Sequence, residues 1–370
     1  MSKKYKAVAL YSGGTDSTLA PIIAREEIGD DMLLLMIDLG CTPESIKQAE
    51  DRAKVLNLDF KVINGVEEFA CRFLSEAIKM NGSYFGYPLG TPLGRAFMME
   101  LALRFLDDNP SIDKFIIHGC NARQNTRFRI EKLCNNSIGI KAMGPFTQRD
   151  YTRLEKVELL KKHGIVASKS DGYAQDENIF CRALEGDIFN NLNVISEDTF
   201  LLTTHPSNAP NEPVVLSILF ENGLPIEING NKMSLCDIIT ECKNIGGKHA
   251  IGRIVSLEDT IPVLGYKERG VYESPASVIL YTVHRYIEDI VLNKIERSIK
   301  RRLEEKWADV VYGGNWFDSE RTQISEFCNI FHSKVSGKVS ISLYKGSITI
   351  LDAQISNSIL LKTDESAGAY

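Results

Sequence analysis

Short apolar runs and longer amphipathic stretches alternate through the first half of the chain. The runs with strand character cover residues 6–11, 32–38, 59–63 and 114–118. The stretches with helical periodicity cover residues 19–27, 43–57, the segment through Phe69, Phe73 and Ala77, about 94–107, and about 150–163. This alternation predicts a doubly wound α/β fold, in which helices cover both faces of a parallel sheet.

The pattern changes near residue 168. Alternating apolar residues on both sides of Asn222-Gly223, and again on both sides of Lys345-Gly346, predict two β-hairpins. Between the hairpins, apolar residues at helical spacing predict one long helix over about 275–305. We therefore expect two domains, an α/β domain over 1–167 and an α+β domain with a mostly antiparallel sheet over 168–370.

A glycine-rich turn follows the first predicted strand, with the sequence Ser-Gly-Gly-Thr-Asp-Ser-Thr over residues 12–18. Adjacent glycines let a backbone turn sharply and approach a ligand closely. Ser17 and Thr18 are expected to cap a helix that begins at Leu19. Backbone N–H groups, hydroxyls and a positive helix end would then face an anion. The turn lacks the lysine and the spacing of a GxxxxGK[ST] loop, so it does not predict γ-phosphate transfer.

Three segments follow predicted parallel strands, namely residues 12–17, 38–41 and 118–125. Ligands of such sheets bind beyond the carboxyl ends of the strands, so these segments should meet at one edge. His118 ends its strand and is expected to be a hydrogen-bonded structural imidazole rather than a general base.

Composition and charge narrow the class of protein. The 370 residues are 44% apolar and 25% charged, with a net charge of −6, which is typical of soluble proteins and argues against nucleic acid as a partner. The basic run at 294–306 has interleaved acids, which favours a solvated helix face. Eight cysteines without a CxxC pair favour a reducing cytoplasm and no zinc site. No apolar stretch approaches the length of a membrane span.

Several separated motifs resemble one enzyme family. Besides the turn at 12–18, they lie at 87–95, 118–129, 176–185, 246–258, 267–275 and 343–346. In their order and spacing the chain resembles the argininosuccinate synthase family, in a divergent form. The turn resembles the pyrophosphate loop of enzymes that cleave ATP between the α and β phosphates.

The resemblance implies a fold and a reaction. The first domain would be an adenine nucleotide α-hydrolase-like nucleotide-binding domain, and the second would bind substrates and form a homo-oligomer, a dimer or a tetramer. A citrulline-like ureido oxygen would attack ATP, bound with Mg²⁺, and release pyrophosphate. An amine, aspartate in the family, would then displace AMP. The partners would be these small molecules, with no membrane and no protein side chain assigned to the metal.

The resemblance also assigns residues. Those expected at the nucleotide are Leu10, Tyr11, Ser12, Gly13, Gly14, Asp16, Ser17, Thr18, Ile37 and Gly119. Those expected at the ureido acceptor and the amine are Tyr87, Thr91, Arg95, Asn121, Asn125, Thr126, Arg129, Glu258 and Tyr272. Asp16, Ser17 and Arg95 are the residues expected to act in catalysis.

The substrate motifs depart from the family pattern at five positions. Pro92, Ala174 and Ala183 stand where the family has serine, and Asn121 and Thr126 stand where it has threonine and aspartate. A neutral Thr126 cannot pair with the ammonium group of an incoming amino acid. The departures favour a changed amine donor, a changed ureido acceptor or both, and drift around an unchanged substrate is the alternative.

Two other functions stay open. Cys41, Cys120 and Cys181 lie inside the site motifs, and a thiolate there could deliver sulfur to an activated carbonyl, as in related sulfurtransferases. A small buried hydrophobic role for these cysteines is favoured, because no basic neighbour is evident in the sequence. A non-catalytic nucleotide-binding protein is disfavoured by the intact loop.

Overall fold

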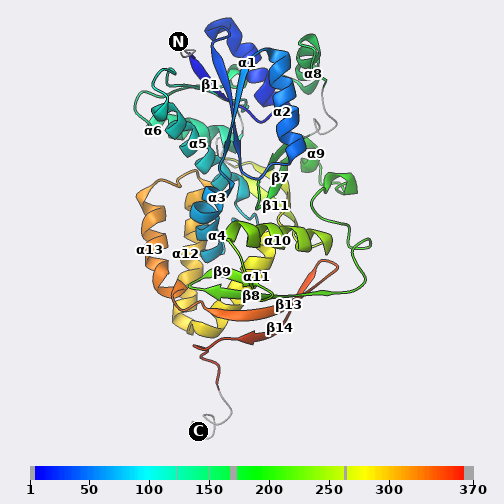
Figure 1. Ribbon diagram of the computed structural model, residues 1–370, viewed down its shortest axis with the longest axis vertical. Coiled ribbons are helices and arrows are strands. Elements are labelled where there is room, and N and C mark those ends of the chain that lie inside the picture. The colour runs from blue at the N-terminus through cyan, green and yellow to red at the C-terminus, as the bar shows by residue number, and fades with distance from the viewer. Residues whose placement is uncertain (1–4, 123, 150, 167–172, 262–264, 362–370) are drawn as a thin grey trace.

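The computed structural model describes residues 5–122, 124–149, 151–166, 173–261 and 265–361. A five-stranded parallel sheet lies at the top of Figure 1. In the order β3-β2-β1-β4-β5, its strands are β1 (Ala7–Leu10), β2 (Met32–Asp38), β3 (Asp59–Asn64), β4 (Phe115–Ile117) and β5 (Lys141–Met143). The strand order reverses between β1 and β4, which is where ligands of open parallel sheets bind.

Helices cover both faces of this sheet, so the predicted doubly wound α/β class is confirmed. The helices are α1 (Thr15–Ile28), α2 (Pro43–Leu56), α5 (Gly90–Asp108), α6 (Asn125–Asn136), α7 (Pro145–Gln148) and α8 (Arg153–Lys162). Strand β1 is buried on both sides: Ala7 and Ala9 pack with α1, α2 and α8, whereas Val8 and Leu10 pack with α5 and α6.

The start of α1 differs from the sequence prediction. The helix begins at Thr15 after Gly14, which adopts an extended conformation, and no side chain caps its first turn. Ser17 and Thr18 are therefore not caps of a helix that begins at Leu19. The hydroxyl of Ser17 instead donates to the Gly14 carbonyl at 3.1 Å. No capping side chain among the described residues therefore covers the N-terminal end of α1, and a helix end of this kind favours an anion.

The second half contains two antiparallel sheets where one was expected. A five-stranded sheet has the order β10-β9-β8-β13-β14, formed by β8 (Val214–Glu221), β9 (Leu224–Ile228), β10 (Asn231–Lys232), β13 (Gly337–Tyr344) and β14 (Ser347–Gln354). A four-stranded sheet has the order β11-β12-β7-β6, formed by β6 (Ala174–Glu177), β7 (Arg182–Glu185), β11 (Arg253–Asp259) and β12 (Lys267–Glu273). Both predicted hairpins are confirmed, as β8–β9 and β13–β14.

The helices of the second half pack mainly beside the five-stranded sheet (Figure 1). They are α9 (Asp187–Asn190), the short η2 (Glu197–Thr199), α10 (Leu235–Lys248), α11 (Pro275–Val291), α12 (Lys294–Tyr312) and α13 (Ser319–His332). The single long helix predicted over 275–305 is wrong. Asn293 adopts an extended conformation and caps α12 through Ile295 and Glu296, which separates α11 from α12.

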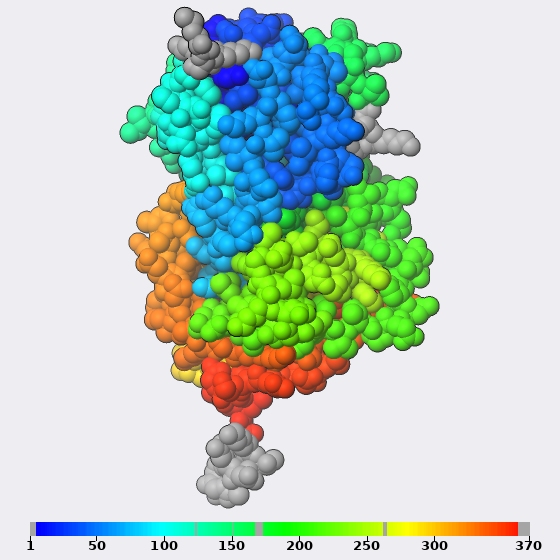
Figure 2. Space-filling view, viewed as in Figure 1, coloured from blue at the N-terminus to red at the C-terminus, as the bar shows by residue number. Residues whose placement is uncertain are grey.

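A segment of the first half builds the core of the second. The segment is α3 (Val66–Phe69), the π-helical turn η1 (Ala70–Leu74) and α4 (Ser75–Lys79). Phe69 and Phe73 are fully buried in one cluster with α11 and α12, and the Phe73 ring stacks on Trp316 at 4.2 Å. In the space-filling view the two halves meet along a broad surface (Figure 2). The predicted boundary at 167/168 lies outside the described residues.

The basic run at 294–306 is not a wholly solvated face. Lys300 is 1% exposed, and its ammonium lies 2.5 Å from both Glu288 and Glu304. It also donates to the Lys79 carbonyl at 2.9 Å, which joins α12 to α4. Lys300, Glu288 and Glu304 thus form a buried charged cluster between α11 and α12. No helix in the described ranges is long and apolar enough to cross a membrane.

Substitution of Lys300 by Met should be strongly destabilising. It leaves two buried carboxylates without their cation, a change that costs about 3–5 kcal/mol of unfolding free energy. Lys306→Met removes an exposed lysine from the same helix and should change that free energy by less than about 0.5 kcal/mol. Urea denaturation of both variants measures the difference, and equal effects would contradict a buried role for Lys300.

Candidate functional site

The glycine-rich loop at 12–18 is held closed by its own serines. Ser17 Oγ accepts a hydrogen bond from the Ser12 amide at 3.2 Å and lies 3.0 Å from Ser12 Oγ. The Thr18 amide donates to the Gly14 carbonyl at 3.0 Å and forms the first α-helical bond. Ser12 and Gly14 are exposed, whereas the neighbouring Leu10 and Tyr11 are buried. The loop is therefore exposed at Ser12 and Gly14 and rests on a buried strand end.

Two glycines let the loop pack against neighbouring backbone. A Cβ on Gly13, which has φ +73°, would lie 2.7 Å from the Ala49 Cα of α2. A Cβ on Gly119 would lie 2.6 Å from the carbonyl of Asp16. Because neither contact leaves room for a side chain, β4 and α2 hold the loop from two sides. The residues present fit a phosphate cradle of this kind.

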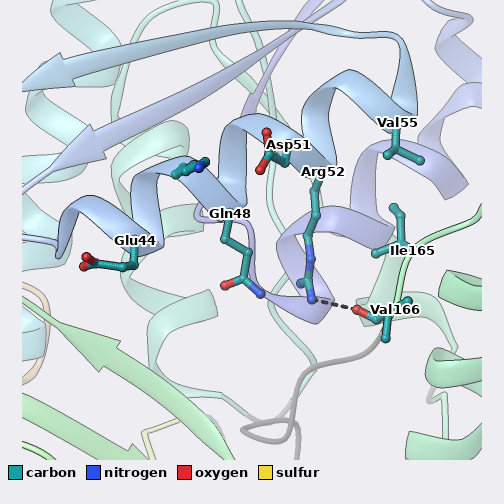
Figure 3. Close-up of a pocket in the computed structure, with 8 residues that line it drawn as sticks. Glu44, Gln48, Asp51, Arg52, Val55, Ile165 and Val166 are labelled. Carbon is teal, nitrogen blue, oxygen red and sulfur yellow. Dashed lines mark hydrogen bonds between the residues drawn. The ribbon is translucent and has the colours of Figure 1, made fainter.

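Arg52 of α2 supports the loop from behind. It is 7% exposed and donates to the Gly13 carbonyl at 2.6 Å and to the Val166 carbonyl at 3.0 Å. Figure 3 shows this side chain in a cavity of about 370 Å³ on the outer side of α2. Sequence reasoning missed Arg52, because nothing in an amphipathic helix marks a cation that points at a distant loop.

Asp16 lies in the first turn of α1 and pairs with a lysine that the motifs did not include. Its carboxylate is 2.8 Å from Lys156 Nζ of α8. Ile37 lies near the end of β2, and beyond it Asp38 accepts hydrogen bonds from the amides of Gly40 and Cys41. No cluster of three His, Cys, Asp or Glu side chains within the described residues is arranged to hold a metal ion.

The residues expected at the acceptor gather around stacked aromatic rings. Tyr87 and Tyr272 stack at 4.3 Å between ring centroids, although they lie far apart in the sequence. The Thr91 amide donates to Tyr87 Oη at 3.0 Å. Arg95, one turn further along α5, pairs with Asp176 of β6 at 3.2 Å. Helix α5 and the four-stranded sheet thus contribute to one site.

Asn125 and Arg129 lie on α6 and contact Tyr312, a residue that the sequence analysis did not identify. Arg129 is 4% exposed and donates through Nε and Nη2 to the Tyr312 carbonyl, at 3.0 and 2.9 Å. Asn125 Nδ2 donates to Tyr312 Oη at 2.9 Å. A tyrosine at the end of an amphipathic helix gives no sequence signal of such a role.

One buried carboxyl group, that of Glu258, and one partly buried carboxyl group, that of Glu185, lie near Arg129. Burial, followed by the charge of Glu185, raises the pKa of Glu258 to about 8. Burial also raises the pKa of Glu185 to about 7, against the opposing charge of Arg129. Strongly shifted carboxyl pKa values of this kind are concentrated at functional sites, because binding and catalysis need groups that folding alone would disfavour.

Three of the expected substrate residues have buried polar atoms without a hydrogen-bond partner among the described residues. They are Arg95 Nε, Asn121 Oδ1 and Tyr272 Oη. Buried polar atoms are normally paired, and an unpaired one costs about 1–3 kcal/mol. A polar ligand would remove this cost if it offered an acceptor to Arg95 Nε, a donor to Asn121 Oδ1 and a hydrogen-bond partner to the Tyr272 hydroxyl.

The positions at which the resemblance implies a departure from the family pattern are distributed as follows. Ala183 of β7 is buried and lies opposite Tyr272 of β12 in the strand register. Thr126 is half-buried at the start of α6, beside Asn125. Pro92 lies in the buried first turn of α5, whereas Ala174 at the start of β6 is exposed.

His118, Cys120 and Cys181 are buried, and Cys41 is partly buried. His118 is 1% exposed, and its Nδ1 accepts from the Cys120 amide at 3.3 Å, so Nε2 carries the proton toward Glu131, 3.5 Å away. Burial lowers the pKa of His118. Burial also raises the pKa of the Cys120 thiol to about 12 and that of Cys41 to about 11.

Comparisons with known proteins cover almost the whole chain. Residues 6–166 match the family model described as the arginosuccinate synthase N-terminal HUP domain, and residues 173–368 match the arginosuccinate synthase C-terminal domain. The argininosuccinate synthase of Methanopyrus kandleri is 33% identical over 94% of this chain and 89% of its own length. That of Pyrobaculum aerophilum is 36% identical, over 94% and 87%. An NAD synthetase structure from Campylobacter jejuni has a TM-score of only 0.32 at 16% identity, over 44% of this chain and 66% of its own.

Replacement of Arg52 by Met should weaken ATP binding about tenfold, because the Gly13 carbonyl loses a charge-assisted hydrogen bond and the loop loses its support. Arg25→Met is the matched control. Arg25 lies on α1, donates to the Leu56 carbonyl at the end of α2 and pairs with Asp30, away from the loop. Isothermal calorimetry with ATP measures both variants. An unchanged affinity in Arg52→Met would contradict the supporting role.

Glu258→Gln should stabilise the ligand-free protein increasingly as the pH rises from about 4.5 to about 8. The folded-state pKa of about 8 exceeds the ordinary value of 4.5, so the stability present below 4.5 is lost as the pH rises through 8. Glutamine avoids that ionisation. The variant should therefore unfold at a higher temperature than the parent at about pH 9 and at nearly the same temperature at about pH 4. Exposed Glu221→Gln is the control, and a pH-independent difference would refute the assignment.

Proposed function

This chain belongs to the argininosuccinate synthase family of ATP-dependent, C–N bond-forming ligases, and from that premise we propose that it adenylates the ureido oxygen of a citrulline-like acceptor. An amine donor then displaces AMP. The observation that carries the proposal is the set of unpaired polar atoms on Arg95, Asn121 and Tyr272, which lie on residues expected to bind these substrates.

In the first step a bond forms between the ureido oxygen and the α-phosphorus of ATP, and the bond to the bridging oxygen breaks to release pyrophosphate. The loop at 12–18 would hold the outer phosphates through its backbone N–H groups, with Mg²⁺ accompanying ATP. Asp16, fixed by Lys156, orients the first turn of α1. Ser17 holds the loop closed, and Gly119 allows the loop to pack against the segment that follows β4.

In the second step the amine nitrogen attacks the activated carbon, the C–O bond breaks, AMP leaves and the amine loses one proton to solvent. The urea C–O bond is hard to break, and adenylation makes its oxygen a good leaving group. The protein contributes position and charge, with Arg95 beside the reacting groups and with Tyr87, Tyr272 and Glu258 around the acceptor. No nucleophilic side chain is needed.

We propose further that the amine donor is not aspartate. The resemblance implies an aspartate side chain at position 126, and Thr126 has no charge with which to pair an ammonium group. Together with the loss of hydroxyls at Pro92 and Ala183, this change argues for altered substrates. Sites that lose buried hydrogen-bond partners discriminate against the original substrate by orders of magnitude.

Sulfur transfer is less well supported than ligation. A thiolate would be needed, and with a pKa of about 12 the buried Cys120 thiol stays protonated near neutral pH. Cys120→Ser should therefore retain the ligase activity, whereas loss of all product formation in that variant would favour sulfur transfer.

A pyrophosphate-release assay tests the proposal. Purified protein is mixed with ATP, Mg²⁺ and each of a panel of ureido compounds, with and without each of a panel of amines. It should release pyrophosphate only when the mixture contains the ureido compound that it adenylates, alone or together with its amine donor. Aspartate should be a poor donor, and Thr126→Asp should improve its kcat/KM by at least about tenfold, since one charged hydrogen bond is restored. Thr322→Asp, on the exposed face of α13, is the control for added charge.

ATP binding without pyrophosphate release for any pair would overturn the ligase assignment. Efficient use of aspartate by the parent chain would overturn the altered-donor proposal alone.

A further inference from the structure

Tyr312 connects the end of α12 to residues expected at the acceptor. Its hydroxyl donates to the Asp259 carbonyl at 2.5 Å and accepts from Asn125 Nδ2 at 2.9 Å. Its carbonyl accepts both hydrogen bonds from Arg129, whose guanidinium also lies 4.9 Å from the centre of the Tyr312 ring. Tyr312 thus holds the side chains of Asn125 and Arg129 on α6, and it also binds the backbone of Asp259 at the end of β11.

These contacts determine how Asn125 and Arg129 are oriented. Asn125 Oδ1 accepts from the Ile261 amide at 2.7 Å, while Nδ2 donates to Tyr312 Oη at 2.9 Å and to the Asp259 carbonyl at 3.2 Å, so the amide is fixed at both ends. Arg129 uses Nε and Nη2 on the Tyr312 carbonyl, so this carbonyl fixes one edge of the guanidinium. Without the Tyr312 hydroxyl, the Asn125 amide and the Asp259 carbonyl would each lose a partner.

The position of Tyr312 is itself fixed by buried contacts along α12. Its ring stacks on Tyr84 at 3.8 Å and 3° between planes. The turn that carries Tyr84 is tied to α12 at Asn81, whose Nδ2 donates to Glu304 at 2.7 Å. Tyr84 Oη also donates to Asp259 Oδ2 at 2.8 Å. The cluster around Lys300 thereby holds this turn and α12 in register with the acceptor region.

We infer that Tyr312 is a positioning residue for the ureido acceptor, acting through Asn125, Arg129 and the backbone beside Glu258. The inference rests on the proposed function. Tyr312 need not touch the substrate: its hydroxyl and carbonyl set the geometry of groups that do. Removal of the hydroxyl should therefore weaken binding of the acceptor. It should leave nucleotide binding intact, because none of the hydrogen bonds described for the loop at 12–18 involves Tyr312.

Tyr312→Phe tests this role, because it keeps the ring, the stacking on Tyr84 and the backbone carbonyl that binds Arg129. We expect the KM for the ureido compound to rise about tenfold, with kcat reduced less than threefold and the KM for ATP unchanged. Tyr5→Phe is the matched control, since it removes a tyrosine hydroxyl that donates to Asp59 at 2.7 Å in the first sheet. Its kinetic constants should match those of the parent.

A double-mutant cycle with Asn125→Ala identifies the route. If Tyr312 acts through Asn125, the double variant should raise the KM for the acceptor by much less than the product of the single effects. Full additivity would overturn that route.

The remaining outcomes separate this inference from the proposed function. If the parent releases no pyrophosphate with any ureido compound, the proposed function fails and the inference fails with it. If the parent is active and Tyr312→Phe keeps its acceptor KM, only the positioning role is overturned. Equal changes in both KM values together with a lower unfolding temperature would assign Tyr312 a purely structural role and would also overturn the inference.

Discussion

The nucleotide half of this molecule depends on backbone contacts that leave no room for a side chain. Gly119 lies against the carbonyl of Asp16, and Gly13 lies against Ala49, so the loop is held between β4 and α2. With its backbone fixed in this way, the loop leads into the first turn of α1, which has no side-chain cap among the described residues, and a helix N-terminus favours an anion. The reversal of strand order between β1 and β4 brings these segments together.

The acceptor half is built differently, from side chains that meet over long distances in the sequence. Tyr87 stacks on Tyr272, Arg95 pairs with Asp176, and Arg129 reaches the backbone of α12. Such a site can change its substrate by single substitutions, because each side chain contributes a separate hydrogen bond or charge. The positions at which the resemblance implies a departure from the family pattern, such as Ala183 and Thr126, are accordingly expected in this region.

The sequence predicts the bounds of an element well where burial determines which positions are apolar. It predicts poorly the roles of residues whose partners lie far away in the sequence. Strand β2 has the predicted bounds because every position in it is apolar or precedes a turn, and the inward positions Phe69, Phe73 and Ala77 are all buried. The start of α1 was misplaced, because hydroxyl residues that usually cap a helix here close a loop. The break at Asn293 was missed because both helices share one apolar spacing. Lys300 and Tyr312 resemble surface residues in the sequence, and only the packing of α11, α4 and α6 against α12 gives them partners.

The aromatic segment from Phe69 to Phe73 has a consequence for how the chain can be divided. These side chains lie in the first half of the sequence but fill the core beneath α11 and α12, where Phe73 stacks on Trp316. A fragment cut near residue 166 would carry them uncovered, and the remaining fragment would have a hollow core. Exposed clusters of this kind promote aggregation. The two halves of the chain therefore make a single folding unit, and neither half is expected to serve as an autonomous module in fusions or evolutionary exchange.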